Sequence, residues 1–205
     1  MGHHHHSRTT LGLLITIGAL AVTSASCSTD GRTLDEPTLP LPVPPPPATT
    51  GPPETTAPPQ LLMIAPWQDG TEIPTRYTCD DADVAPALTW TNIPAGTVEL
   101  AVTVTDLDAA GFTHWILYGL APTETGLVEG VIPNEAIQST NSYGLKGWNG
   151  PCPPIDQIHR YQFTIHALNQ QLEVADDAPA SDVISVLNLT SIAQRSVSGT
   201  YLRTG

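Results

Sequence analysis

Two ionisable side chains that open a strand after a proline-rich loop are the residues of this sequence best placed to do chemistry. The loop is residues 150–154 (GPCPP), and the strand begins with His159 and Tyr161. Because side chains alternate along a strand, these two share one face, and that face continues with Phe163 and Ile165. A buried imidazole or phenol is costly unless it is paired or lines a cavity. The pattern predicts a small polar pocket at the end of a β-sheet.

Two other segments end in the same way. In residues 99–106 (ELAVTVTD) and 112–120 (FTHWILYGL), apolar side chains occupy every second position and so share one face of the strand. In each segment one polar residue lies on that apolar face, Asp106 in the first and His114 in the second. With the histidine and tyrosine of the first strand, four polar side chains on three strands stand where an ordinary core would have Val or Leu. A single buried histidine is usually a hydrogen-bonded core residue, but a sheet tolerates few unexplained polar insertions. The four are therefore predicted to converge.

The chemistry available to such a cluster is hydrogen bonding to an oxyanion. Two imidazoles and a phenol can donate to a phosphate or carboxylate, while the Asp106 carboxylate orients one ring and favours its charged form. A zinc site uses the same residue types, and Asp106, His114 and His159 would make a three-ligand set for a metal-dependent hydrolase. The sequence has no Gly-x-Ser-x-Gly elbow for serine hydrolysis. Anion binding and metal-dependent hydrolysis remain as alternatives.

Several short motifs, taken in order, resemble one protein family. They are YTC at 77–79, DLDA at 106–109, FTHW at 112–115, GPCPP at 150–154 and HRY at 159–161. The set resembles the phosphatidylethanolamine-binding protein family, in particular its bacterial Raf-kinase-inhibitor-like branch, over about Met63 to Tyr201. The resemblance implies an antiparallel β-sandwich with Greek-key topology. It also implies an anion-binding pocket, whose members would be Asp106, His114, His159 and Tyr161, with the backbone of Gly150 and Pro151 as one wall.

Charge excludes some partners. The 205-residue chain has a formal net charge of −13 and a pI near 4.6. Nucleic-acid binding requires clustered Lys and Arg, and the few basic residues here are scattered. Electrostatic attachment to anionic lipid headgroups is disfavoured for the same reason. Any bound anion must be held by local geometry rather than by a general positive field.

The N-terminal part is expected to be a leader and a tether. Residues 1–26 have a basic residue, an apolar run and a small-residue end, which is typical of a lipoprotein-type signal peptide, and Cys27 would carry the lipid. Simple cleavage followed by secretion, or an uncleaved anchor, are the alternatives. Residues 27–60 hold about half of the 21 prolines and are predicted to be a disordered, extended linker. The protein is thus expected outside the cytoplasm, attached to the cell membrane.

Residues 61–205 are predicted to form one mainly β domain with a short C-terminal helical segment. The helix is expected over Ser181–Ala193, with Ser181 as N-cap and an inner stripe that includes Ile192. The expected strands, which proline and glycine separate, are Leu61–Ala65, Ala87–Thr91, Glu99–Asp106, Thr113–Leu120, His159–Leu168 and Ser196–Leu202.

Two cysteines remain in this domain, Cys79 and Cys152. In an exported protein an even pair most simply forms one disulfide, which would tie residues 77–79 to the pocket loop. The alternative is a nucleophilic Cys152 close to His159. Taken together, the sequence predicts a non-enzymatic binding module that needs no cofactor and holds a small anionic ligand. The alternatives are the metal-dependent hydrolase and a surface interaction protein with a vestigial pocket.

Overall fold

The structure is a computed structural model, and it describes residues 60–205. The signal peptide expected over 1–26, the lipidated Cys27 and all but the last residue of the expected linker lie outside the described residues. Over residues 60–205, no helix is both long enough and apolar enough to cross a membrane.

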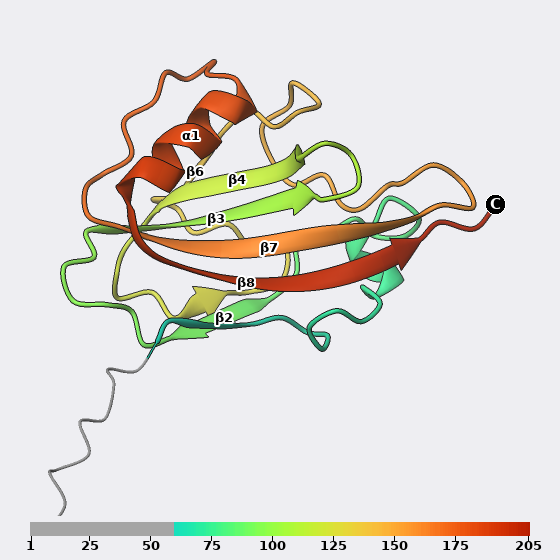
Figure 1. Ribbon diagram of the computed structural model, residues 1–205, viewed down its shortest axis with the longest axis horizontal. Coiled ribbons are helices and arrows are strands. Elements are labelled where there is room, and N and C mark those ends of the chain that lie inside the picture. Colours follow the sequence, from blue (N-terminus) through green and yellow to red (C-terminus); the bar gives the residue numbers. More distant parts are fainter. Residues whose placement is uncertain (1–59) are drawn as a thin grey trace, which may run out of the picture. The chain divides into compact units, whose positions relative to one another are not determined.

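Two antiparallel sheets and one helix make up the domain, as predicted (Figure 1). The larger sheet has the strand order β6-β4-β3-β7-β8, and the smaller has the order β1-β2-β5. Neighbouring strands are antiparallel throughout. The strands are β1 (Leu62–Ile64), β2 (Leu88–Thr91), β3 (Glu99–Asp106), β4 (Phe112–Leu120), β5 (Gly126–Leu127), β6 (Ile137–Gln138), β7 (Ile158–Leu168) and β8 (Ser191–Leu202); a 3-10 helix spans Thr75–Tyr77 and α1 spans Ala180–Thr190.

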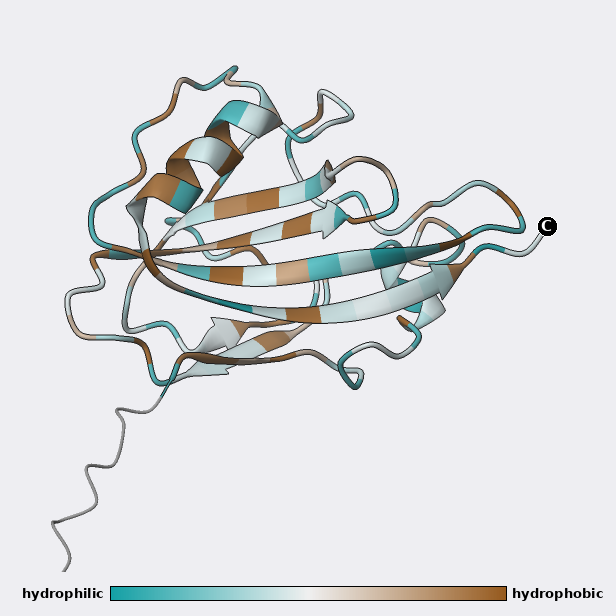
Figure 2. Cartoon of the chain, in the orientation of Figure 1, coloured by the Kyte–Doolittle hydropathy of each residue, from teal (hydrophilic) through white to brown (hydrophobic). Residues whose placement is uncertain are grey.

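The large sheet is covered on both faces. One face packs against the small sheet around a core that includes Trp90, Trp115 and Phe163. The opposite face packs against α1, through Val183 and Leu187 of the helix. Figure 1 shows α1 and β2 on opposite sides of this sheet, and Figure 2 shows hydrophobic residues interspersed along its central strands. Burial of both faces holds the central strands rigid, and the polar cluster stands at their ends.

Burial on both faces corrects the simple alternation expected for β3. Along Glu99–Asp106 every residue is buried except Thr105, which is partly buried. The strand lies between β4 and β7, and α1 covers the face that the alternation pattern left for solvent. Ala101 on that face belongs to a second, smaller core, and Thr103 on the same face is buried. Period-two patterning identified the strand but underestimated its burial.

The C-terminal helix is shorter than predicted. It spans Ala180–Thr190, and the chain enters β8 directly at Ser191. The residue that precedes it is Pro179, whereas the predicted N-cap Ser181 bonds to the side chain of Asp182. Ile192, expected on the inner face of the helix, is 45% exposed at the start of β8. Pairing of residues 191–193 with the end of β7 outcompetes continuation of the helix.

A buried histidine links three elements on the α1 side of the sheet. The Ser191 hydroxyl donates to Leu187 O at 2.6 Å, so it accepts the Nδ1–H of His166 at 3.2 Å. The other ring nitrogen, Nε2, then accepts from the Thr103 hydroxyl at 3.0 Å. This arrangement requires a neutral imidazole, and burial lowers the pKa of His166 to about 4.

This network predicts acid sensitivity. Between pH 6.5 and pH 4 the unfolded chain binds a proton at His166 and the folded protein does not, so stability falls as pH falls, by about 3 kcal/mol in all. His166→Gln removes this titration. Unfolding free energies of parent and variant are measured in urea at pH 7 and at pH 4. Between these pH values we expect the parent to lose about 3 kcal/mol more than the variant. Parallel pH profiles would contradict the assignment.

Cys79 and Cys152, at a sequence separation of 73, are joined by a disulfide. The backbone reinforces the link, because Cys79 N donates to Pro151 O at 3.2 Å. The bond ties the segment after the 3-10 helix to the proline-rich loop. Because its sulfur is in the disulfide, Cys152 has no free thiol. The structure therefore does not support the alternative of a nucleophilic Cys152.

Removal of the disulfide should destabilise the domain. The paired change Cys79→Ser with Cys152→Ser frees a loop of 73 residues, and loop-closure entropy corresponds to about 4 kcal/mol for that length. Chemical denaturation of the parent and the double variant measures the loss. Thiol counting in denaturant, before and after reduction, checks the pairing itself, and two free thiols in the native exported protein would refute it.

Candidate functional site

The strand register brings the four predicted site residues to one end of the large sheet. Asp106, the last residue of β3, stands opposite Tyr161 of β7 on one side and opposite Phe112 of β4 on the other. His159 and His114 lie two residues along from these partners. The structure therefore assembles the four side chains as the strand-end pattern anticipated, whereas their role in binding stays a prediction.

Asp106 and His159 form the closest polar contact of the cluster. The Nδ1 atom of His159 lies 2.7 Å from Asp106 Oδ2, and the other carboxylate oxygen accepts the backbone N–H of Asp108 at 2.8 Å. Asp106 is 3% exposed. Since a carboxylate only accepts hydrogen bonds, Nδ1 of His159 carries a proton and Nε2 is the atom left for other partners. When His159 is charged, the pair is neutral overall.

His114 is held by backbone carbonyls instead of a carboxylate. Its Nδ1 lies 2.9 Å from Asn149 O and 3.2 Å from Gly150 O. The ring is enclosed edge-on by the rings of Phe112, Tyr143 and Tyr161, at centroid distances of 5.4, 5.5 and 5.2 Å. His114 is 2% exposed, and burial lowers its pKa. At neutral pH its ring is uncharged.

Tyr161 has an unused donor. Its hydroxyl lies near the Asp106 carboxylate and the Cys152 backbone, but it is the one buried side-chain polar atom among residues 60–205 that makes no hydrogen bond of acceptable distance and angle. Burial, with a smaller contribution from the Asp106 carboxylate, raises the pKa of Tyr161, so the hydroxyl keeps its proton. The Tyr161 ring lies against both imidazoles, 5.2 Å from His114 and 6.4 Å from His159. An unpaired buried hydroxyl costs free energy that a ligand acceptor would recover.

A residue that the sequence reasoning missed, Asp83, positions the loop beside His114. One oxygen of its carboxylate accepts the Gly150 N–H at 2.8 Å and Trp148 Nε1 at 3.0 Å. The Trp148 ring packs against Phe163 and Trp115, which makes it part of the core. No strand pattern marks Asp83, because it lies in a loop with a left-handed backbone, at φ 48°.

Asn141 is a second missed residue. It is buried, and its amide nitrogen donates to His114 O and to the Asn149 side chain, at 3.2 and 2.7 Å. Its side-chain oxygen accepts the backbone N–H groups of Tyr143 and Leu145. An asparagine in a turn predicts only the last kind of contact. Here it also fixes the loop from which the Asn149 carbonyl reaches the imidazole.

The nearest strong cation is already paired. Arg160 donates three hydrogen bonds to Asp108, from its backbone N, Nε and one terminal nitrogen, at 2.7 to 3.0 Å. The pairing lowers the pKa of Asp108 to about 2. The ion pair anchors the loop after β3 and leaves its charge outside the cluster, so the cluster contains no Lys or Arg.

The metal-centre alternative finds no support in the geometry. Within the part of the chain that the structure describes, no three His, Cys, Asp or Glu side chains are grouped so as to hold a metal ion. In the set proposed from sequence, the Nδ1 atoms of His159 and His114 are engaged by Asp106 and by backbone carbonyls respectively. The hydrolase that this set implied therefore lacks an assembled metal site.

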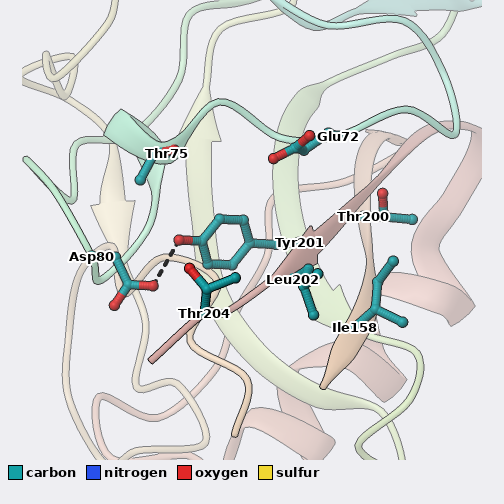
Figure 3. A pocket seen from close by; sticks show the side chains of 8 residues that line it. All are labelled: Glu72, Thr75, Asp80, Ile158, Thr200, Tyr201, Leu202 and Thr204. Carbon is teal, nitrogen blue, oxygen red and sulfur yellow. Dashed lines mark hydrogen bonds between the residues drawn. The ribbon is translucent and has the colours of Figure 1, made fainter. Parts of the chain in front are cut away.

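A surface hollow lies beside the start of β7 and the end of β8. Its volume is about 500 Å³, and its lining includes Glu72, Asp80 and Tyr201 (Figure 3). The Tyr201 hydroxyl donates to Asp80 at 2.7 Å, and Arg203 Nε reaches the other oxygen of that carboxylate at 2.9 Å. None of the four cluster residues lines this hollow. Its two carboxylates, Glu72 and Asp80, do not suit an anion.

Comparison with known proteins defines the class of this two-sheet antiparallel fold with a polar cluster at its strand ends. The family model described as "Phosphatidylethanolamine-binding protein" matches residues 64–202. The chain belongs to the phosphatidylethanolamine-binding protein family, whose members are generally binding proteins rather than enzymes. This confirms the resemblance identified from the sequence motifs.

Individual relatives agree. A UPF0098 protein of Methanothermobacter thermautotrophicus is 34% identical over 144 residues, which are 67% of this chain and 95% of that protein. LppC of Mycobacterium tuberculosis, whose name makes it a candidate lipoprotein, is 37% identical over 136 residues, 65% of this chain and 67% of its own length. The crystal structure of Escherichia coli YbcL, described as a member of the mammalian PEBP family, matches with a TM-score of 0.66 and 28% identity over 70% of this chain and 98% of YbcL.

The close approach at Gly150 generates a prediction. A Cβ atom there would collide with the Tyr77 carbonyl oxygen and the Asp83 carboxylate, so the loop must move away if the residue is changed. We expect Gly150→Ala to cost about 3 kcal/mol of unfolding free energy and to shift the His114 ring resonances.

The matched control is Gly144→Ala, in the preceding turn. Gly144 has a φ of 76° but nothing within 4 Å of an added Cβ, so only backbone strain of about 1 kcal/mol is expected. Equal losses in the two variants would show that the contact at Gly150 is unimportant.

Proposed function

We propose that this protein is a binding module that holds a small anionic ligand, with a phosphate or carboxylate group, among Asp106, His114, His159 and Tyr161. The backbone of Gly150 and Pro151 forms one wall of the site. The observation that supports this most directly is the buried Tyr161 hydroxyl, which donates to nothing in residues 60–205. A proton donor kept in a buried place without an acceptor suits a ligand that brings one.

Charge limits what such a site does. The domain is acidic, and its nearest guanidinium is committed to Asp108. Attraction must come from directed hydrogen bonds: the Tyr161 hydroxyl, and the Nε2–H of His159 whenever that ring is charged against Asp106. A small group with one negative charge matches these few donors. Nucleic acid, with its regular array of charges, does not.

The proposal includes no catalytic step. Cys152 is in a disulfide, and the Ser142 hydroxyl, which accepts the backbone N–H of Thr113 at 2.9 Å, makes no hydrogen bond to a histidine or carboxylate among the described residues. The cluster thus offers groups that can orient a ligand, and among the described residues it pairs no serine or cysteine with a base. Binding, as in the family generally, is the function that these residues support.

We also propose that the protein is tethered outside the cytoplasm through a lipid on Cys27, with residues 27–60 as a spacer between the anchor and the domain. The sequence pattern of residues 1–27 carries this part of the proposal, and the naming of LppC as a candidate lipoprotein is consistent with it. Simple secretion after cleavage remains the alternative. In either case the ligand would be met outside the cytoplasm.

Binding is tested by titrating the protein with inorganic phosphate, acetate and phosphoethanolamine while following histidine resonances by NMR. At least one of these should shift both His114 and His159. Tyr161→Phe removes only the idle donor, and we expect about a tenfold loss of affinity.

The control is Tyr118→Phe, because Tyr118 is also buried but packs beneath α1, in the other core. That variant should bind as the parent does. If none of the three anions shifts either histidine, or if the two phenylalanine variants behave alike, the site does not bind anions in the way proposed.

A further inference from the structure

We propose a second binding site, at the opposite end of the large sheet from the polar cluster, that binds the ammonium group of a primary alkylamine. The site is a hollow of about 420 Å³ beside the start of β3 and the end of β4, and the Glu99 carboxylate holds the ammonium. Glu99 is the first residue of β3 and Asp106 is the last, so about 23 Å of strand separates the two sites. This site is independent of the function proposed above.

Glu99 is a buried carboxylate without a cationic partner. It is 7% exposed, and no salt bridge joins it to a Lys, Arg or His among residues 60–205. Ala101, on the same face of β3, belongs to the second core, so an apolar side chain would also suit this position. Burial raises the pKa of Glu99, because no neighbouring cation compensates its charge. A buried, uncompensated carboxylate in a hollow is a candidate binding group.

The protein uses only one oxygen of this carboxylate. Oε1 accepts the backbone N–H of Leu172 at 3.4 Å, which is a long contact, and the N–H of Gly119 lies close to the carboxylate. Oε2 makes no hydrogen bond to residues 60–205, yet it is not enclosed as the partnerless Tyr161 hydroxyl is. Oε2 is therefore accessible from the hollow that Glu99 lines. A ligand that donates a hydrogen bond would satisfy it.

The rest of the lining suits an alkylammonium. Two further carboxylates, those of Glu124 and Glu135, face the hollow, and no Lys or Arg of the described residues lines it. Carboxylates without basic neighbours favour a cation over an anion. Val98, Leu120 and Pro122 add apolar surface, against which an alkyl chain can pack.

Other cations match the hollow less well. Over residues 60–205, no three His, Cys, Asp or Glu side chains are grouped so as to hold a metal ion. A guanidinium binds best to both oxygens of a carboxylate at once, and Oε1 of Glu99 is already engaged by Leu172. A quaternary ammonium is bound by aromatic faces, and no aromatic side chain of the described residues lines the hollow. A compact ammonium with N–H donors is the group that one open oxygen matches.

The test titrates the full protein with n-butylamine at pH 7.5 and follows the resonances by NMR. At this pH the amine keeps its proton, and ionisation of a carboxylate with a raised pKa is favoured. We expect the backbone amides of Gly119 and Leu172, which lie at the Glu99 carboxylate, to shift. The ring resonances of His114 and His159 should stay unchanged.

Two probes of similar size check the chemistry of the ligand. The uncharged n-butanol should shift neither amide, and n-butylguanidine should bind at least about threefold more weakly than n-butylamine. A third probe, lysine capped as N-acetyl-lysine methylamide, identifies the source of the ammonium. Tighter binding than n-butylamine assigns the site to a lysine side chain of a partner protein, and equal or weaker binding assigns it to a free alkylamine; both results support the proposal.

A variant isolates the carboxylate. Glu99→Gln keeps the size of the side chain and removes its charge, so n-butylamine should bind at least about tenfold more weakly. The matched control is Glu173→Gln, which removes a charge from an exposed side chain that does not line the hollow. Its affinity should stay within about twofold of the parent, because exposed charges are screened. Thermal melting checks that both variants are folded, and the amide shifts of the parent test the site even if Glu99→Gln does not fold.

Several results would overturn the inference. They are unshifted amides at Gly119 and Leu172, equal shifts with n-butanol, tighter binding of n-butylguanidine, or unchanged affinity in Glu99→Gln. The histidine cluster takes no part in these measurements. Failure here therefore leaves the proposed anion binding intact, and failure of anion binding leaves this site intact.

Discussion

The contact between the His114 ring and the backbone carbonyls of Asn149 and Gly150 is the interaction on which the site depends. It requires the loop before Cys152 to approach β4 closely. Three otherwise unrelated features serve that approach: the absence of a side chain at Gly150, the Asp83 carboxylate and the disulfide to Cys79. Each of them acts on the loop and none acts on the ring directly. The orientation of the imidazole is thus set by loop packing.

In the function proposed here, an acidic domain holds an anion, and this arrangement supplies the means. No general positive electrostatic field is expected around the site, because the chain carries a net charge of −13 and Arg160 is ion-paired with Asp108. The rigid sheet instead places a few groups of defined hydrogen-bonding character side by side. Hydrogen-bond donors attract a ligand only at short range. For the proposed site we therefore expect selectivity to come from geometry, and we expect electrostatic steering to add little to the association rate.

Much of the site was predictable because it follows from strand parity. Asp106, His114, His159 and Tyr161 interrupt apolar alternation at strand ends, and antiparallel pairing of β3 with β4 and β7 brings those ends together. The disulfide was predictable from the even number of cysteines in the domain and from the expected export of the protein. Asp83 and Asn141 were not, because their partners are loop atoms that no periodic pattern connects.

The errors in the fold have a similar cause. The residues after Thr190 are compatible with a helix, so the sequence predicts a helix that continues past Thr190, yet these residues pair with the end of β7 instead. The helix propensity of a few residues is a weak determinant of where a helix ends. Pairing with a distant strand, which satisfies the backbone N–H and C=O groups, overrides it. The burial of both faces of β3 was missed for the same reason, since α1 comes from a distant part of the chain.

The two buried histidines, His114 and His166, differ in role: one is a candidate binding residue and the other is structural. His166 has both ring nitrogens satisfied, by Thr103 and Ser191, and leaves nothing for a ligand. His114 has one nitrogen satisfied and stands beside a hydroxyl with no partner. Burial lowers the pKa of both. What distinguishes a structural histidine from a candidate binding residue here is therefore the count of satisfied nitrogens, a property of the neighbours that neither sequence parity nor burial reveals.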